Sequence, residues 1–215
     1  MAKILAVQPN APDDKTVRIA SEALKRGEVV ALPTDTLYGL CALASNTKTI
    51  KQLFSVKGRT DEKGAPILIG KMDQLALLAK HFPPQANRVM AALWPGALTL
   101  ILPAREDVPV PLIEDKGVAV RMPNQALCLA IALNSGPFAA TSANRPGNLP
   151  LDSTSTIDSE FGELTSLILD GGKIEGGLAS TVVDIRGEKP ILIREGTVLF
   201  VSVVAAWESH SKSYD

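Results

Sequence analysis

The chain alternates between stretches with helical spacing of apolar residues and short, continuous apolar runs. Spacing of three to four residues predicts helices, and apolar runs bounded by turn residues predict buried strands. We expect helices with this spacing at 13–26, 47–57, 73–80, 84–94, 124–133 and 153–160. We expect strands at the apolar runs 28–33, 40–44, 66–69, 97–102, 117–121, 137–141, 166–169, 181–185 and 190–194. The run 197–207 fits either a further strand or a packed helix, and 208–215 is expected to fray.

These elements predict a mixed sheet. The connection between 181–185 and 190–194 is too short for a helical crossover, so these two strands must pair antiparallel. The strands lack clean apolar–polar alternation, which indicates that helices cover at least one face. No repeat or Gly/Ser-rich linker divides the sequence, so we expect one domain over 1–215, in the α/β (or α+β) class.

The composition of the chain excludes several classes of partner and of catalytic site. The 215 residues carry a formal net charge of −1, which argues against a broadly basic nucleic-acid binder but leaves a local basic patch open. No apolar run approaches the ~18 residues that span a bilayer, and the N-terminus is a poor signal peptide. Two cysteines and two histidines argue for a reduced, cytoplasmic setting and against zinc or Ser–His–Asp sites.

A cationic cluster follows the second predicted helix. Lys57, Arg59 and Lys63 fall within seven residues, and their repulsion must be relieved by Asp61 and Glu62 or by a bound anion. The sequence leaves two interpretations open, a phosphate site and a solvated charged loop.

Small polar side chains follow two of the predicted strands. Thr34 and Thr36 come directly after 28–33, and Thr141-Ser142-Ala143-Asn144 ends the run 137–141. Such residues at strand ends can bind ligands or simply cap turns, and both interpretations stay open.

Two arginines end predicted buried strands. Arg121 closes 117–121 and Arg194 closes 190–194, while Ser180-Thr181 opens a third strand. A guanidinium at such a position needs an anion, which could be a ligand carboxylate or a structural ion pair. Together these strand ends suit a phosphate-rich ligand with a small carboxylate-bearing one, and they offer no evident general base or nucleophile.

Six motifs resemble the YrdC-like family of threonylcarbamoyl-AMP synthases in the same order along the chain. They are Pro33-Thr34-Asp35-Thr36-Leu37-Tyr38-Gly39-Leu40, Lys57-Gly58-Arg59, Arg121-Met122-Pro123, Thr141-Ser142-Ala143-Asn144, Ser180-Thr181-Val182-Val183-Asp184 and Arg194-Glu195-Gly196. The resemblance covers about 13–196 and implies a twisted mixed β-sheet flanked by helices around a central cavity, a YrdC/RibB-like fold. It implies the short, single-domain type, because only a short extension follows Arg194.

The resemblance also implies an activity. Family members are nucleotidyltransferases that join L-threonine, bicarbonate (or CO2) and ATP into L-threonylcarbamoyladenylate and release pyrophosphate. The product serves N6-threonylcarbamoyladenosine formation on tRNA, completed by a separate threonylcarbamoyl-transferase complex. The resemblance implies Mg²⁺ held mainly by the ATP phosphates, no protein-bound metal, weak tRNA binding and no membrane partner.

Site residues are carried over by motif. The resemblance implies catalytic roles for Lys57, Arg59, Ser142 and Asn144. It implies L-threonine contacts from Thr34, Thr36, Arg121, Thr141 and Ser180. It implies ATP contacts from Lys57, Arg59, Lys63, Ser142, Asn144, Thr181 and Arg194. The sequence departs from the family pattern where Gly64-Ala65 separates Lys63 from Pro66 and where Thr60 replaces a common proline.

Two other functions remain alternatives. A double-stranded RNA or tRNA-binding module would bind with steep salt dependence and ignore threonine, but the chain lacks an obvious aromatic platform. A paralogue that forms another carbamoyl-adenylate is the second alternative, although such domains belong to longer chains.

Overall fold

The protein is described here by a computed structural model that covers residues 2–56, 64–174 and 177–209. Within these residues one eleven-stranded sheet runs through the molecule, in the order β1-β9-β2-β3-β8-β4-β7-β5-β10-β11, with β6 paired to β7. Its strands are β1 (Lys3–Ala6), β2 (Val29–Pro33), β3 (Tyr38–Leu43), β4 (Ile67–Leu68), β5 (Leu98–Pro103), β6 (Ile113–Glu114), β7 (Gly117–Arg121), β8 (Phe138–Ser142), β9 (Thr165–Asp170), β10 (Thr181–Asp184) and β11 (Ile191–Arg194).

The sheet is mixed, as the sequence predicts. Strands β1, β9 and β2 pair in parallel, whereas β2, β3, β8 and β4 follow one another antiparallel. Strand β10 lies parallel to β5, and its short connection to β11 makes that pair antiparallel. Because β2, β3 and β8 alternate in direction, the carboxyl ends of β2 and β8 lie beside the start of β3.

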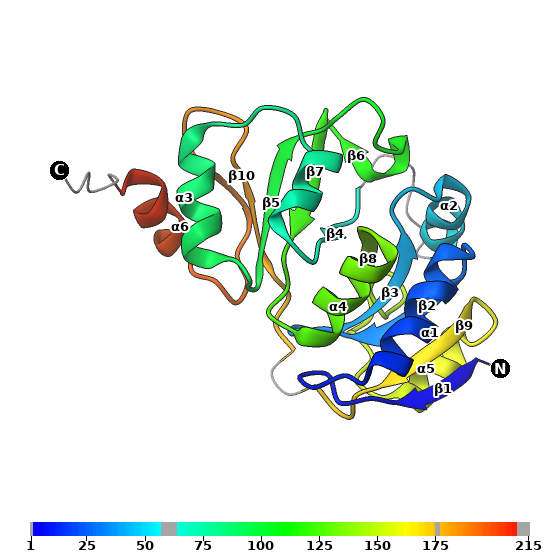
Figure 1. The fold of residues 1–215 in the computed structure, drawn as a ribbon. Helices are drawn as coiled ribbons and strands as arrows, with labels where there is room; N and C mark the ends of the chain where they lie inside the picture. Colours follow the sequence, from blue (N-terminus) through cyan, green and yellow to red (C-terminus); the bar gives the residue numbers. More distant parts are fainter. Residues whose placement is uncertain (1, 57–63, 175–176, 210–215) are drawn as a thin grey trace.

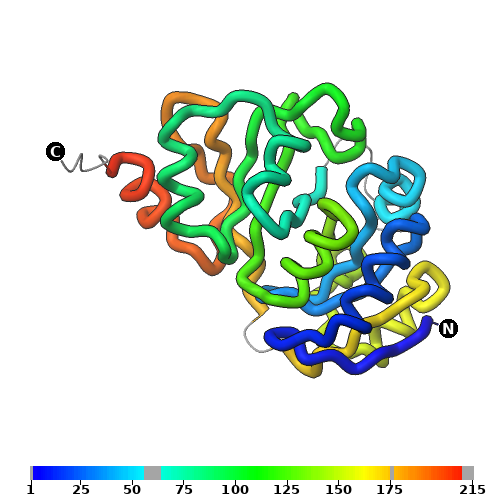
Figure 2. The backbone as a smooth tube through the Cα atoms, in the orientation of Figure 1, coloured from blue at the N-terminus to red at the C-terminus, as the bar shows by residue number. Residues whose placement is uncertain are grey.

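Helices cover the sheet on both sides. They are α1 (Asp14–Lys25), α2 (Thr47–Val56), α3 (Pro84–Leu93), α4 (Ala126–Ser135), α5 (Thr154–Phe161) and α6 (Phe200–Glu208), with short 3₁₀ helices η1 (Met72–Leu77) and η2 (Val110–Leu112). Figure 1 shows α1 beside α4 in front of β2 and β3, and α3 beside α6 next to β5 and β10. The continuous tube in Figure 2 shows the same arrangement of the backbone.

Alternate residues of β2 enter two hydrophobic cores. Val30 and Leu32 pack with Leu24 of α1 and Leu127 of α4, whereas Val29 and Ala31 belong to the cluster on the opposite face. Each face of β2 is therefore buried, which explains why this strand is a continuous apolar run rather than an alternating one.

The first helix begins and ends as its sequence predicts. Asp13 is the N-cap, with Oδ1 accepting from the backbone N–H of Thr16 at 2.9 Å. Gly27 follows the helix at φ +80°, where a side chain would be strained and a built Cβ would lie 2.5 Å from Asn46. These end signals are local, so the sequence alone is enough to predict them.

Four elements differ from the prediction. In place of the helix predicted at 73–80 the chain forms the 3₁₀ helix η1 over Met72–Leu77, and the strands β1 and β6 and the helix η2 were not predicted. The run 197–207 resolves as a helix, because α6 buries Val203 and Trp207, and the Trp207 carbonyl accepts from Arg88 Nη2 at 2.6 Å. Among the described residues, no helix is long and apolar enough to cross a membrane.

Candidate functional site

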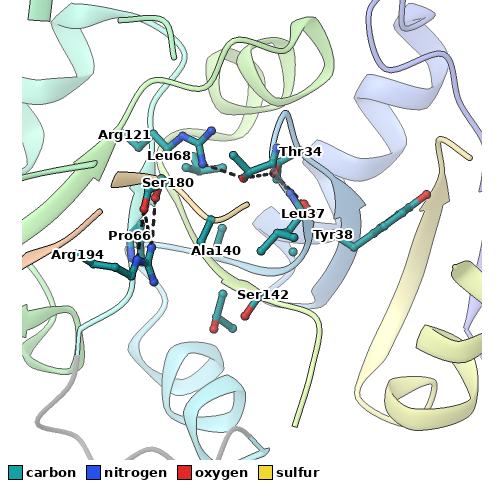
Figure 3. Close-up of a pocket in the computed structure, with 14 residues that line it drawn as sticks. Thr34, Leu37, Tyr38, Pro66, Leu68, Arg121, Ala140, Ser142, Ser180 and Arg194 are labelled. Carbon is teal, nitrogen blue, oxygen red and sulfur yellow. Dashed lines mark hydrogen bonds between the residues drawn. The ribbon is translucent and has the colours of Figure 1, made fainter. Parts of the chain in front are cut away.

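Strand ends from both halves of the sheet surround one pocket. The pocket is open to solvent, and the space between its walls, counted together with that opening, is about 620 Å³. Its lining comes from the ends or starts of β2, β3, β4, β7, β8, β10 and β11: Thr34, Thr36, Leu37, Tyr38, Gly39, Pro66, Leu68, Arg121, Ala140, Thr141, Ser142, Ala179, Ser180 and Arg194. Figure 3 shows Arg121 and Arg194 on separate parts of the pocket wall.

The loop after β2 is fixed by its own hydroxyls. Thr34 Oγ1 donates to the Leu37 carbonyl at 2.7 Å and accepts from the backbone N–H groups of Thr36 and Leu37, both at 3.1 Å. Its proton and both acceptor positions are thus used, and the Thr36 hydroxyl oxygen lies 3.0 Å away. The predicted threonine-binding residue Thr34 therefore shapes the loop, while the hydroxyl of Thr36 keeps acceptor capacity at the pocket wall.

Arg121 is held on three sides. Its Nη2 donates to Asp35 Oδ1 at 2.6 Å, its Nη1 to Thr36 Oγ1 at 3.0 Å and its Nε to the Gly96 carbonyl at 3.0 Å. The structure thus shows the ion pair that the sequence left as one of two interpretations. A guanidinium has five N–H donors, so one N–H on each terminal nitrogen has no protein partner within the described part of the chain.

Two polar residues at the end of β8 behave differently. Thr141 is buried, and its hydroxyl has no hydrogen-bond partner among the described residues. Ser142 Oγ donates to Asn144 Oδ1 at 2.7 Å, and Asn144 Nδ2 donates to the Asn148 carbonyl at 2.6 Å. A buried hydroxyl without a partner costs free energy, and a ligand in the pocket can supply the missing bond to Thr141.

Ser180 and Arg194 form the opposite wall. Arg194 Nη2 donates to the Ser180 carbonyl at 2.9 Å, and Nε approaches the same oxygen at 3.3 Å. The Ser180 hydroxyl lies 2.9 Å from the hydroxyl of Thr99, which is fully buried on β5. Figure 3 shows the bonds between Arg194 and Ser180 at the side of the pocket away from Thr34.

The structure does not bring Thr181 into the pocket lining. This predicted ATP-binding residue is fully buried, and its Oγ1 donates to the Val198 carbonyl at 2.5 Å and accepts from the N–H groups of Gly196 and Val198. A hydroxyl has one donor and two acceptor positions, so none remains for a nucleotide. Asn144 lies beside the lining through Ser142, whereas Lys57, Arg59 and Lys63 lie outside the described residues.

Sequence reasoning missed two contributors to the site. Asp35 was not among the predicted site residues, yet it pairs with Arg121, and Thr99 had no evident signal because it stands inside an apolar run. Tyr38 also lines the pocket, but its hydroxyl points away from the pocket and donates to the Gly172 carbonyl at 2.7 Å. Only the position of Asp35 next to Thr34 and Thr36 could have indicated its part in the site.

The described residues offer neither an activated thiol nor a clustered metal site. Cys41 and Cys128 are fully buried, and desolvation raises the pKa of both thiols. No group of three or more His, Cys, Asp or Glu side chains within 2–56, 64–174 and 177–209 could hold a metal ion. Two arginines, several hydroxyls and one neutralised carboxylate suit the binding and positioning of a polar, anionic ligand pair.

The fold and pocket thus define an α/β protein with a polar pocket where the strand ends of a mixed sheet converge. The sequence model of the Sua5/YciO/YrdC family, described as "Telomere recombination", matches residues 22–196. The chain belongs to this family.

Similar proteins agree with this assignment. The threonylcarbamoyl-AMP synthase of Pyrococcus abyssi is 38% identical over 182 residues, which are 84% of this chain and 54% of that protein. A putative threonylcarbamoyl-AMP synthase of Mycobacterium tuberculosis is 32% identical over 190 residues, 87% of this chain and 88% of the relative. The crystal structure of P. abyssi Sua5 complexed with L-threonine superposes with a TM-score of 0.87 at 35% identity, over 94% of this chain and 60% of that one. The chain therefore spans little more than half the length of the P. abyssi protein, and the predicted twisted mixed sheet flanked by helices is confirmed.

Proposed function

We propose that this protein is an L-threonylcarbamoyladenylate synthase that uses L-threonine, bicarbonate or CO2, and ATP. Two relatives carry the name of that activity, and the P. abyssi Sua5 structure contains L-threonine. The product would pass to a threonylcarbamoyl-transferase complex that modifies tRNA, for which the protein needs no more than weak affinity. We place this activity in the cytoplasm, where tRNA and ATP are both available.

The convergence of Arg121, Thr141, Ser142, Ser180 and Arg194 on one pocket carries the proposal. A synthase must hold an amino acid and a nucleotide together, with reacting atoms roughly in line. Residues from distant strands could equally have faced separate surfaces, in which case no single reaction would use them. Their meeting in one pocket supports a two-ligand reaction.

Threonine fits the part of the pocket near Arg121. The two remaining N–H groups of Arg121 can bind its carboxylate, and the buried hydroxyl of Thr141 can bind its polar groups. Thr36 and Ser180 supply further hydroxyls. Thr34 contributes by fixing the loop that presents Thr36.

We assign the triphosphate to the wall formed by Ser142 and Arg194, with Asn144 beside it, and we assign the family motif residues Lys57, Arg59 and Lys63 to the same phosphates. Cations and hydroxyls stabilise the charge that builds up on phosphate oxygens during transfer. Because the Thr181 hydroxyl is occupied within the protein, we assign it to positioning the chain after Arg194 rather than to direct contact with ATP.

The chemistry needs no histidine. The threonine amine attacks CO2, forms a C–N bond and loses a proton, which gives a carbamate. A carbamate oxygen then attacks the α-phosphorus, and the bond to the β-phosphate oxygen breaks as pyrophosphate leaves. Positioning and charge neutralisation by the pocket's own residues supply most of the rate enhancement.

Magnesium enters this proposal only as a companion of ATP. The carboxylate of Asp35 at the pocket is committed to Arg121, and the described residues form no acidic cluster that fits a metal ion. Mg²⁺ would therefore be held by phosphate oxygens and water, as it commonly is, and no step above depends on it.

A pyrophosphate-release assay tests the activity. The protein is incubated with ATP, magnesium, bicarbonate and one amino acid at a time, and we expect pyrophosphate only with threonine and only with bicarbonate. Release without bicarbonate, or equal release with every amino acid, would contradict the proposal. Salt-sensitive RNA binding without any release would favour the RNA-binding alternative instead.

A further inference from the structure

Both oxygens of the Asp35 carboxylate accept hydrogen bonds, next to the lining residues Thr34, Thr36 and Arg121. Oδ1 accepts from Arg121 Nη2 at 2.6 Å, and Oδ2 accepts from the backbone N–H of Asn124 at 2.9 Å. The side chains of Arg121 and Asp35 are only 6% and 13% exposed. The carboxylate is therefore anchored to the backbone beyond β7 and cannot leave the guanidinium without losing two bonds.

This pair changes the charge of the subsite. A buried guanidinium without a counter-ion is an uncompensated charge, and it attracts any small anion that reaches it. With Asp35 in place the pair is neutral, and only the directional N–H groups that remain on Arg121 select a ligand. A zwitterionic amino acid brings its own ammonium group to balance its carboxylate, whereas phosphate and pyrophosphate bring only negative charge.

The same pocket must keep the amino acid and the phosphate ligands apart. Ser142 and Arg194 line it together with Arg121, so the triphosphate and the pyrophosphate product lie within one cavity with the amino-acid subsite. A bare cation at Arg121 would let pyrophosphate occupy the place of threonine.

We propose that Asp35 is a specificity-determining residue: it keeps the Arg121 subsite electrically neutral, so that the subsite accepts a zwitterionic amino acid and excludes free phosphate and pyrophosphate. The inference rests on the proposed function in taking an amino acid as the ligand at Arg121 and the triphosphate as the ligand at the wall of Ser142 and Arg194. It concerns a residue that need not touch the reacting atoms.

Direct binding measurements test this inference without turnover. Pyrophosphate binding is measured by calorimetry in buffer without ATP or magnesium, for the wild-type protein and for Asp35→Asn and Asp35→Glu. We expect Asp35→Asn to bind pyrophosphate about tenfold or more tightly than the wild type, in competition with threonine. Asp35→Glu keeps the negative charge and is expected to behave like the wild type.

Asp184 provides a matched control. It forms a similar pair with Arg186 at 2.6 Å, with side chains 14% and 26% exposed, and neither residue lines the pocket. Asp184→Asn is expected to leave pyrophosphate binding unchanged. An equal gain in Asp184→Asn, or no gain in a folded Asp35→Asn, overturns the inference.

The wild-type protein gives a second test that does not depend on the folding of a variant. We expect saturating pyrophosphate to leave the dissociation constant of threonine nearly unchanged, because pyrophosphate stays at the other wall. Direct competition between the two in the wild type overturns the inference. If the wild type releases pyrophosphate in a threonine-dependent way but Asp35→Asn gains no pyrophosphate affinity, the proposed function stands and this inference falls. If Asp35→Asn gains pyrophosphate affinity but the wild type shows no turnover, this inference stands and the proposed function falls.

Discussion

The hydroxyl oxygens of Thr99 and Ser180 lie 2.9 Å apart and join β5 to the start of β10 at the pocket wall. Thr99 is fully buried, so its hydroxyl serves the interior of the protein rather than solvent. Because Arg194 bonds to the carbonyl of the same Ser180, a change at Thr99 is transmitted to both a hydroxyl and a guanidinium of the site.

Thr99→Val should therefore affect ligand binding without a direct contact. The substitution keeps the shape but removes the partner of Ser180, and we expect the KM for threonine to rise about three- to tenfold with a stability loss of about 1–2 kcal/mol. Steady-state pyrophosphate release and urea unfolding measure the two effects. Thr165→Val is the control, because Thr165 bonds to Phe161 outside the pocket; equal kinetic effects in both variants would contradict this reasoning.

Arg121→Ala should raise the threonine requirement far more than the ATP requirement. It removes the carboxylate donors and also leaves Asp35 buried without its partner, which is expected to cost about 3–5 kcal/mol of stability. Arg121→Lys keeps the charge but loses the planar fork, so an intermediate defect is expected. Separate KM values for threonine and ATP check the prediction, and an unchanged threonine KM in folded Arg121→Lys would count against it.

Lys57→Ala and Arg59→Ala should each strongly reduce the rate of turnover with ATP. We expect the loss because both cations belong to the motif assigned to the phosphates, where charge neutralisation dominates catalysis. Lys51→Ala, an exposed lysine on α2, is the control. Normal ATP-dependent pyrophosphate release by Lys57→Ala would weigh heavily against the proposed reaction.

The two buried thiols predict a loss of stability in alkali. Burial raises the pKa of Cys41 and Cys128 in the folded protein, and the Cys128 thiol adds to the effect on Cys41. Above the unfolded thiol pKa of about 8.5 the unfolded state has lost protons that the folded state keeps, so stability falls by up to about 1.4 kcal/mol per pH unit for each thiol. Below that pH the two thiols contribute no slope.

Urea unfolding at pH 7.5, 9 and 10 measures this dependence. The double variant Cys41→Ala/Cys128→Ala is expected to show a shallower decline above pH 8.5, whatever its absolute stability. The same decline in both proteins would show that other groups cause it.

Local signals made much of the fold predictable. The N-cap Asp13, the stop at Gly27 and the short link between β10 and β11 each depend on residues close in the sequence. Strand β1 was missed because it is mostly exposed and pairs with β9, far along the chain. Its four residues carry no periodic pattern that predicts such a partner.

The site was predictable in its residue types and less so in its partnerships. Arg121 was chosen because a guanidinium at the end of a buried strand needs an anion, and Ser142 because small hydroxyls at strand ends often bind ligands; both line the pocket. Arg194 lines it too, but the prediction that it ends a buried strand was wrong, because all four residues of β11 are exposed. The Asp35–Arg121 pair joins positions 86 residues apart, and no sequence rule chooses between a structural anion and a ligand for such an arginine. Only the fold decides that.

Thr181 is a motif residue that supports the site without lining the pocket. Its side chain gathers three backbone groups from 196–198, just past the strand that carries Arg194. Serine at position 181 would keep these hydrogen bonds. The nearly isosteric valine would remove them, so the turn at 196–198 and the side chain of Arg194 would no longer be held in place. The residues tolerated at position 181 should therefore be those that keep these internal hydrogen bonds, whichever nucleotide the protein binds.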